Sequence, residues 1–140
     1  MSRDNVQIVR HAYAAAFRKP KPDFATVNAL YHPDHELVTP LSRLEGTTYS
    51  GAAGFREWFR SRADDWDSVT FRLHEAVEID ESRVLLAATF QGRGKRAGVP
   101  IEQLQGFVVS VRDGKVVRTE AYSTVDEARA ASGLAARTLS

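Results

Sequence analysis

The chain contains no cysteine, which excludes disulfide bonds, thiolate zinc sites and a cysteine nucleophile. It has no apolar run of membrane-spanning length, and its first five residues lack the basic start and apolar core of a signal peptide. Its 19 basic and 18 acidic residues leave a net charge of +1, so no field of one sign favours nucleic acid or an anionic membrane. We therefore expect a cytoplasmic protein with neither nucleic acid nor membrane as a partner.

What the sequence does contain is typical of one folded unit. It has 140 residues, of which 43% are hydrophobic and 26% are charged. A chain of this size buries roughly two-thirds of its unfolded surface around one core, and this composition excludes wholesale disorder. We therefore predict a single domain over residues 1–140.

The first half of the chain has the pattern of three helices. We expect Asp4 to cap a first helix whose apolar residues recur at helical spacing. These are Val6, Val9, Tyr13, Ala16 and Phe17. We expect Asp23 to cap a second helix, which His32-Pro33 would end. A third helix would bury Phe55 and Trp58.

The second half has the pattern of strands, because the hydrophobic period changes from 3.6 to 2 after Trp66. Asp113-Gly114 lies between two β-branched runs and predicts a type I′ turn of a hairpin. We expect four consecutive antiparallel strands, the last three over residues 83–91, 99–111 and 115–122. A short strand over 35–39, a loop over 40–54 and a final helix over 126–134 complete the predicted order.

The predicted order is helix, helix, strand, glycine-rich loop, helix and meander. Four local motifs lie along it. They are Tyr31-His32-Pro33-Asp34, Tyr49-Ser50-Gly51 with Gly54, Arg112-Asp113-Gly114-Lys115-Val116, and residues 128–134. In this order the chain resembles the nuclear transport factor 2-like superfamily, and more closely its bacterial SnoaL-like branch, over residues 6–134. The resemblance implies an α+β fold in which a cone-shaped, curved antiparallel sheet wraps around N-terminal helices and encloses an apolar pocket.

The resemblance also bears on activity, because the superfamily includes ketosteroid isomerases, polyketide cyclases, epoxide hydrolases and dehydratases beside binding modules. Tyr13 aligns with the tyrosine that completes the oxyanion hole of the isomerases. Thr39, before Pro40, stands where their carboxylate base should be, and Phe107 stands where their second acid should be. Neither residue can replace a carboxyl group, so chemistry of the isomerase type is not expected.

Three residues are our candidates for catalysis: His35, Glu120 and Tyr13. His35 titrates near neutral pH and could act as a base, or it could be a passive polar lining. Glu120 could transfer a proton if it faces inward, or it could be a solvated carboxylate paired with Arg118 or Lys115. Tyr13 could donate a hydrogen bond in the pocket, or it could be an ordinary core residue.

Alternation along the strands selects the candidate ligand-binding residues. They are Leu37, Thr39, Trp58, Gln103, Gln105, Phe107, Thr119 and Tyr122. On the last strand, either Thr119 with Ala121 or Glu120 with Tyr122 faces the pocket, and the aligned isomerases favour Thr119. The two glutamines could instead lie on the outer face, and Trp58 could be a core residue.

These observations predict a protein that binds a small hydrophobic molecule, without a cofactor or a metal. It would be a cofactor-independent cyclase, isomerase or hydrolase working by general acid/base chemistry, or a non-catalytic binding or interaction module of the same fold. The resemblance implies a homodimer formed through the outer face of the curved sheet.

Overall fold

The computed structural model describes residues 2–18, 21–94, 98 and 100–133. Within these ranges, side chains are described except at 2–4, 52, 59 and 61–69. No helix among the described residues is both long enough and apolar enough to span a bilayer.

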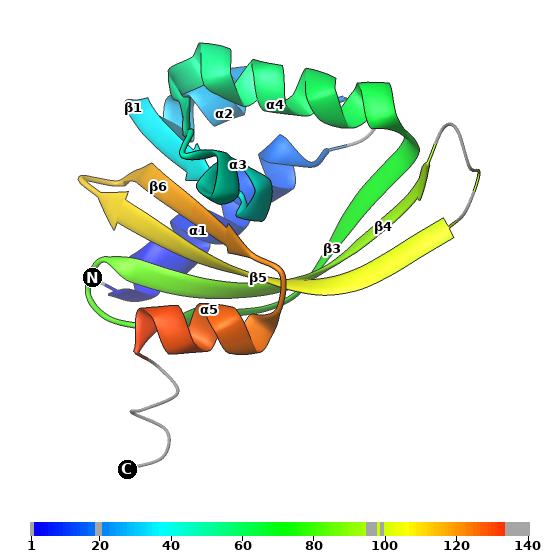
Figure 1. The fold of residues 1–140 in the computed structure, drawn as a ribbon. Coiled ribbons are helices and arrows are strands. Elements are labelled where there is room, and N and C mark those ends of the chain that lie inside the picture. The colour runs from blue at the N-terminus through cyan, green and yellow to red at the C-terminus, as the bar shows by residue number, and fades with distance from the viewer. Residues whose placement is uncertain (1, 19–20, 95–97, 99, 134–140) are drawn as a thin grey trace.

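A six-stranded curved sheet carries helices on both of its faces (Figure 1). Its strand order is β2-β1-β6-β5-β4-β3. The strands are β1 (Tyr31–Val38), β2 (Tyr49–Ser50), β3 (Trp66–Glu78), β4 (Arg83–Gly94), β5 (Pro100–Arg112) and β6 (Lys115–Tyr122). The helices are α1 (Ser2–Ala16), α2 (Phe24–Leu30), α3 (Pro40–Glu45), α4 (Gly51–Asp65) and α5 (Val125–Ser132). The α+β class and the curved sheet around the first helix are thus confirmed.

The predicted meander is confirmed, because β3, β4, β5 and β6 are neighbours in the sheet and pair antiparallel. The hairpin between β5 and β6 turns at Asp113 and Gly114, whose φ angles are +54° and +76°. Both positive values are those of a type I′ turn, which matches the right-handed twist of the two strands. The turn sets the pairing of Arg112 with Lys115 and of Val111 with Val116, and an irregularity between Ser110 and Val111 then shifts the register by one residue.

The first strand departs from the predicted antiparallel sheet. β1 pairs with β6 in parallel, and its other edge pairs with the short antiparallel strand β2. β1 also begins at Tyr31, so His32 and Pro33 lie in this strand and do not separate it from α2. Pro33 fits there because the β1–β6 pairing is irregular between Tyr31 and Glu36.

Two predictions about helix ends meet different outcomes. Asp23 caps α2 as predicted, since its carboxylate accepts a hydrogen bond from the backbone N–H of Thr26 at 3.2 Å. Asp4 was expected to be a cap but lies inside α1, which begins at Ser2. The helix thus begins before its capping candidate.

The segment predicted as a loop over 40–54 contains α3, β2 and the start of α4. α3 forms because Thr39 and Ser42 make a reciprocal capping box, with Pro40 at the start of the helix. Ser42 N–H donates to Thr39 Oγ1 at 3.0 Å, and Thr39 N–H donates to Ser42 Oγ at 2.8 Å. Gly46, with φ +70°, ends the helix.

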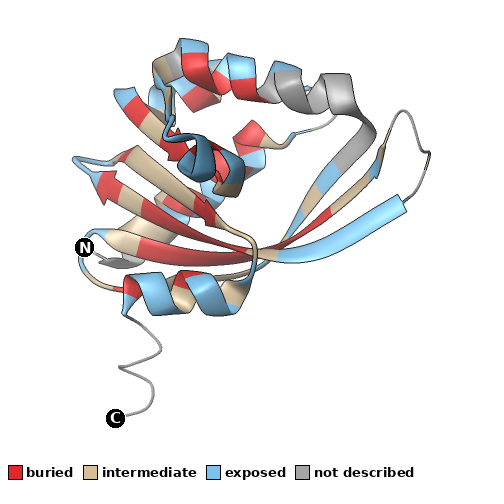
Figure 2. Ribbon diagram, viewed as in Figure 1, coloured by how far each residue is buried: buried red, intermediate tan, exposed pale blue. Residues whose placement is uncertain are grey.

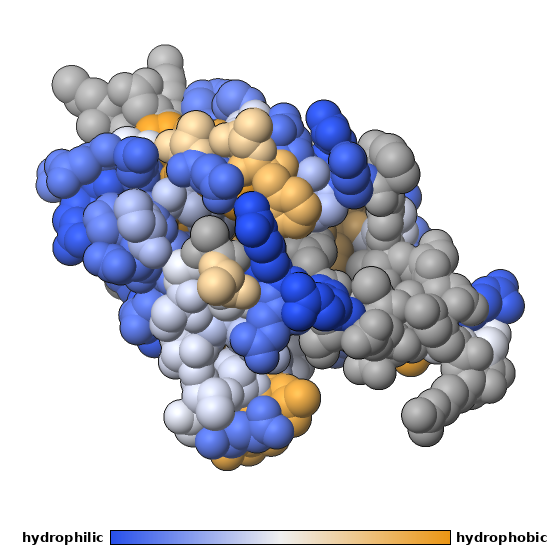
Figure 3. Space-filling view, turned by 90° about the horizontal axis from the view of Figure 1, so that it is seen from above, coloured by the Kyte–Doolittle hydropathy of each residue, from blue (hydrophilic) through white to orange (hydrophobic). Residues whose placement is uncertain are grey.

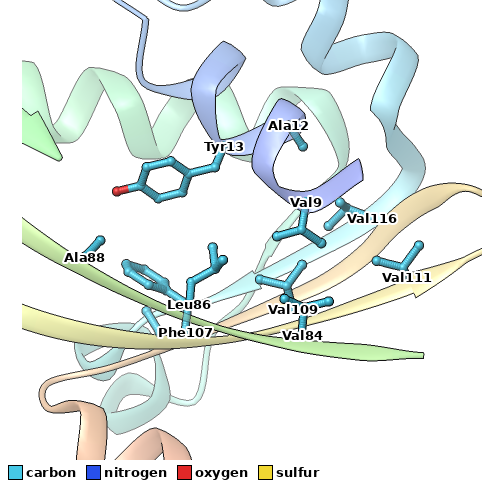
Figure 4. Close-up of a cluster of buried hydrophobic side chains, with 11 residues drawn as sticks. Val9, Ala12, Tyr13, Val84, Leu86, Ala88, Phe107, Val109, Val111 and Val116 are labelled. Atoms are coloured by element: carbon cyan, nitrogen blue, oxygen red, sulfur yellow. The ribbon is translucent and has the colours of Figure 1, made fainter. Parts of the chain in front are cut away.

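The main core lies between α1 and the concave inner face of the sheet (Figures 2 and 4). Its buried members are Val9, Ala12, Tyr13, Val84, Leu86, Ala88, Phe107, Val109, Val111, Val116 and Ala121. A second cluster lies on the outer face, where Ala128 of α5 packs against Leu85 and Val108. Because successive residues of a strand point to opposite faces, β4 is buried on both sides from Val84 to Phe90.

Candidate functional site

A cavity lies inside the molecule between the inner face of the sheet and the helices α1 and α4. Its volume is about 50 Å³. The lining residues that matter for its chemistry are Tyr13 from α1, Trp58 from α4, His35, Leu37 and Thr39 from β1 and its end, Gln105 and Phe107 from β5, and Thr119 from β6. The structure therefore brings eight of the eleven residues selected from the sequence together around one space.

Strand alternation explains how β1, β5 and β6 supply the wall. His35, Leu37 and Thr39 are two residues apart, so they share the inner face, and each is at least 94% buried. Thr119 pairs with Leu37 across the parallel β1–β6 ladder. Because of this register, His35 of β1 and Thr119 of β6 lie side by side at the cavity.

The Tyr13 side chain extends from α1 across the inner face of the sheet, on the same side as Phe107 and Leu86 (Figure 4). Its residue is 8% exposed, and its ring packs against Phe17 at a centroid distance of 4.7 Å. Among the described side chains, the Tyr13 hydroxyl is the buried polar group for which no hydrogen-bond partner exists. Burial raises the pKa of this hydroxyl, and the Tyr31 hydroxyl nearby adds to the rise. Tyr13 is therefore a protonated donor that faces apolar surroundings.

His35 is the second polar group of the cavity and is 2% exposed. Its Nε2 atom is hydrogen-bonded to Thr119 Oγ1 at 3.2 Å. Its ring also meets Tyr31 edge to face, with centroids 4.6 Å apart. Burial lowers the pKa of His35 to about 4, because the imidazolium form would lose its hydration. The imidazole is thus neutral at neutral pH.

The described residues of the cavity wall carry no formal charge. No Asp, Glu, Lys or Arg is present among its described lining residues. In the view from above, the described surface is mainly polar, with an apolar band in its upper part (Figure 3). An uncharged lining favours an uncharged ligand, because a buried ion without a partner is strongly destabilised.

Thr39 has a structural task besides lining the cavity. Its hydroxyl oxygen accepts the hydrogen bond from Ser42 N–H that caps α3. The residue is 6% exposed, and Pro40 beside it also lines the cavity. Thr39 therefore ties the cavity wall to α3.

Glu120 and Tyr122 do not line the cavity, because they alternate with Thr119 and Ala121 and so lie on the outer face. The Tyr122 hydroxyl donates to Glu120 Oε2 at 3.5 Å. Arg118 Nε lies 3.8 Å from Glu120 Oε1. Of the two registers left open by the sequence, the structure has the one with Thr119 and Ala121 inward. Glu120 takes the position of a paired carboxylate on the outer face.

Gln103 also lies away from the cavity and is exposed. Its amide donates to the carbonyl oxygen of Ser123 at 3.2 Å. Gln105, two residues along β5, does line the cavity, and its amide donates to Gln103 Oε1 at 3.4 Å. β5 extends past the cavity at this point, so only the glutamine nearer Phe107 reaches the wall.

Sequence reasoning did not select Phe17, Tyr31 and Phe71 as site residues, although all three line the cavity. The signal was present, because Phe17 lies on the apolar side of the first helix and Phe71 on the inner side of its strand. Tyr31 was assigned to the second helix, which hid its place at the start of β1.

Comparison with known families gives a match to the SnoaL-like domain over residues 9–119. A comparison with curated proteins found no match. The matched segment runs from α1 into β6 and includes the cavity residues Tyr13 and Thr119.

Solved structures share the fold over most of the chain. An NTF2-like protein from Burkholderia thailandensis is 27% identical, with a TM-score of 0.71, and the match covers 90% of this chain and 95% of that one. TerC, co-crystallised with polyporic acid, is 22% identical, with a TM-score of 0.73 and coverage of 91% and 96%. A proposed SnoaL-like polyketide cyclase from Jannaschia sp. CCS1 is 9% identical, with a TM-score of 0.75 and coverage of 91% and 90%. From the family match and this shared fold, the chain belongs to the SnoaL-like family.

Proposed function

We propose that this protein binds a small, uncharged, mainly apolar organic molecule that carries a hydrogen-bond-accepting oxygen. The observation that carries the proposal is the buried Tyr13 hydroxyl, which has no partner among the described residues. A buried hydroxyl left unpaired costs about 1–3 kcal/mol, so a ligand oxygen that accepts from it gains that energy on binding. A carbonyl oxygen fits this role.

The rest of the cavity supports the same kind of ligand. Phe107, Trp58 and Leu37 offer apolar and aromatic contact, and each is buried. His35 and Thr119 add a second polar point, and both are neutral at neutral pH. The structure of TerC with polyporic acid is a case in which a protein of this fold was crystallised with a small organic molecule.

Acid/base conversion of the ligand is our second candidate function, and the pair of His35 and Thr119 is the observation that favours it. A neutral imidazole can accept a proton, but a conjugate acid with a pKa of about 4 makes it a weak base. Tyr13 would act as the electrophilic donor. We leave Glu120 out of this chemistry because it lies on the outer face. The weakness of His35 as a base places binding ahead of conversion.

The test uses Tyr13→Phe and two ligands of nearly equal shape. Acetophenone has a carbonyl oxygen where α-methylstyrene has a methylene group. We expect Tyr13→Phe to weaken acetophenone binding by roughly five- to tenfold, the value of one hydrogen bond, and to leave α-methylstyrene binding unchanged. Titration calorimetry measures both dissociation constants, and NMR of the recovered acetophenone shows whether it has been converted.

The stability of the free protein supplies the control. Tyr13→Phe removes an unpaired buried hydroxyl, so we expect the free energy of unfolding to stay the same or to rise. An equal loss of affinity for the two ligands would contradict the hydrogen bond to Tyr13. Failure of the wild-type protein to bind either ligand would contradict the proposed function.

We also propose that the protein is a homodimer formed through the outer face of the sheet. Leu104 of β5 is 51% exposed there, at a shallow depression lined also by Ala87 and Val125. We expect Leu104→Glu to convert a dimer into a monomer, because the interface would bury the added charge. Light scattering after size-exclusion chromatography measures the mass. Leu44→Glu, on the 87% exposed Leu44 of α3, is the matched control and should leave the mass unchanged.

A further inference from the structure

A second space, the outer hollow, lies beside the cavity between α2, β1 and the start of α4. Its volume is about 200 Å³. It is lined by Val27, Asn28, Tyr31, His32, Pro33, His35, Gly51 and Phe55. The hollow is therefore larger than the cavity, whose volume is about 50 Å³.

The two spaces share a wall made of three rings. Tyr31, His35 and Phe55 line both the cavity and the outer hollow. The Tyr31 ring lies 4.6 Å from that of His35 and 5.4 Å from that of Phe55, centroid to centroid. Because the same side chains face both spaces, the wall is one side chain thick.

The outer hollow is mainly apolar, with polar groups at its rim. Val27 is 3% exposed and Phe55 is 6% exposed, so two of its surfaces are well-packed hydrocarbon. Asn28 is exposed. His32 Nδ1 accepts a hydrogen bond from Asp34 N–H at 3.0 Å. No Asp, Glu, Lys or Arg belongs to the described lining of the hollow.

We propose that the outer hollow is a second subsite for the same ligand and takes an uncharged alkyl or aryl substituent attached to the group bound by Tyr13. This inference rests on the proposed function, since the polar end of the ligand lies in the cavity. The apolar substituent passes the wall of Tyr31, His35 and Phe55 and contacts Val27 and Phe55, so its own apolar surface is removed from water. The substrate class is thus a ketone or related carbonyl compound longer than the cavity alone can hold.

The experiment compares acetophenone with butyrophenone, which has two more methylene groups on the acyl side. In the wild-type protein we expect butyrophenone to bind roughly tenfold more tightly, from the burial of two methylene groups. Asn28→Trp fills the outer hollow and should reduce that ratio to about one. Ala29→Trp is the matched control, because Ala29 is exposed on the same helix and lines neither space. In Ala29→Trp, butyrophenone should still bind roughly tenfold more tightly than acetophenone.

A second measurement does not depend on the folding of Asn28→Trp. In the wild-type protein, the terminal methyl group of butyrophenone should show intermolecular NOEs to the methyl groups of Val27. The second subsite would be overturned if the affinity ratio of the two ketones were near one in the wild-type protein, or if Asn28→Trp left a tenfold ratio intact. NOEs from that methyl group to Val109 in place of Val27 would overturn it as well. These outcomes leave acetophenone bound, whereas failure of the proposed function would show as no binding of acetophenone itself.

Discussion

Lowering the pH from 7 to 4 is expected to reduce the free energy of unfolding by about 3 kcal/mol through His35 alone. The pKa of His35 falls from 6.5 to about 4 on folding, because its ring is buried. Between these two values the unfolded chain binds a proton that the folded chain does not, so stability rises with pH. The contribution is complete above pH 6.5 and is lost as the pH falls toward 4.

The measurement is urea unfolding at a series of pH values for the wild-type protein and His35→Gln, which cannot titrate. The pKa values of Asp23 and Asp80 are also lowered, by hydrogen bonds from Thr26 and from Ser82 with Arg83. Their stabilisation declines in more acidic solution in both proteins, so the difference between wild type and variant isolates His35. Parallel curves for the two proteins between pH 4 and 6.5 would contradict a neutral, buried His35.

Replacing Gly106 by alanine is expected to lower the free energy of unfolding by about 1–3 kcal/mol, the usual cost of overpacking. A Cβ atom at Gly106 would lie 2.7 Å from the Cβ of Ala128 and 2.9 Å from the Cα of Val125. Val125 contributes a backbone atom, which side-chain rotation cannot move. The substitution must therefore displace α5 from the outer face of β5.

Chemical unfolding followed by circular dichroism measures the effect, and Gly94→Ala is the matched control. Gly94 is also a strand glycine, and a Cβ atom there would meet nothing within 4 Å. Hydrogen exchange at the amide of Ala128, which donates to Thr124 O, reports on α5 directly. Equal stability of Gly106→Ala and Gly94→Ala would show that α5 adjusts without cost.

The parts of the fold that could be predicted are those whose signal is local. The Asp113-Gly114 turn, the period of two in β4 to β6 and the Asp23 cap each depend on a few neighbouring residues. They were confirmed for that reason. α3 also had a local signal, the Thr39 and Ser42 capping box with Pro40, but the glycines of this segment favoured a loop.

The parts that could not be predicted depend on distant segments. Nothing near Tyr31 indicates that its backbone pairs with Val116 of β6, and this pairing makes Tyr31 the first residue of β1. The parallel direction of β1 has the same cause. Whether two strands run parallel or antiparallel depends on how the chain connects them, and a local sequence pattern does not show this.

The candidate site follows the same division. Strand alternation selected Leu37, Thr39 and Phe107, because each inner face repeats every second residue. It left two alternatives for β6, and the sheet register places Thr119 inward and Glu120 outward. The unpaired hydroxyl of Tyr13 is a property of the packed molecule and has no counterpart in the sequence.

The parallel pairing of β1 with β6 has a consequence for the order in which the protein folds. His35 and Thr119, which meet in the cavity, are 84 positions apart in the chain. Closing so long a loop has a large entropic cost, and contacts of this kind form slowly compared with the local hairpin of β5 and β6. The cavity is thus completed only when β6, made later on the ribosome, meets β1, made earlier, and a ligand can bind only after both strands are in place.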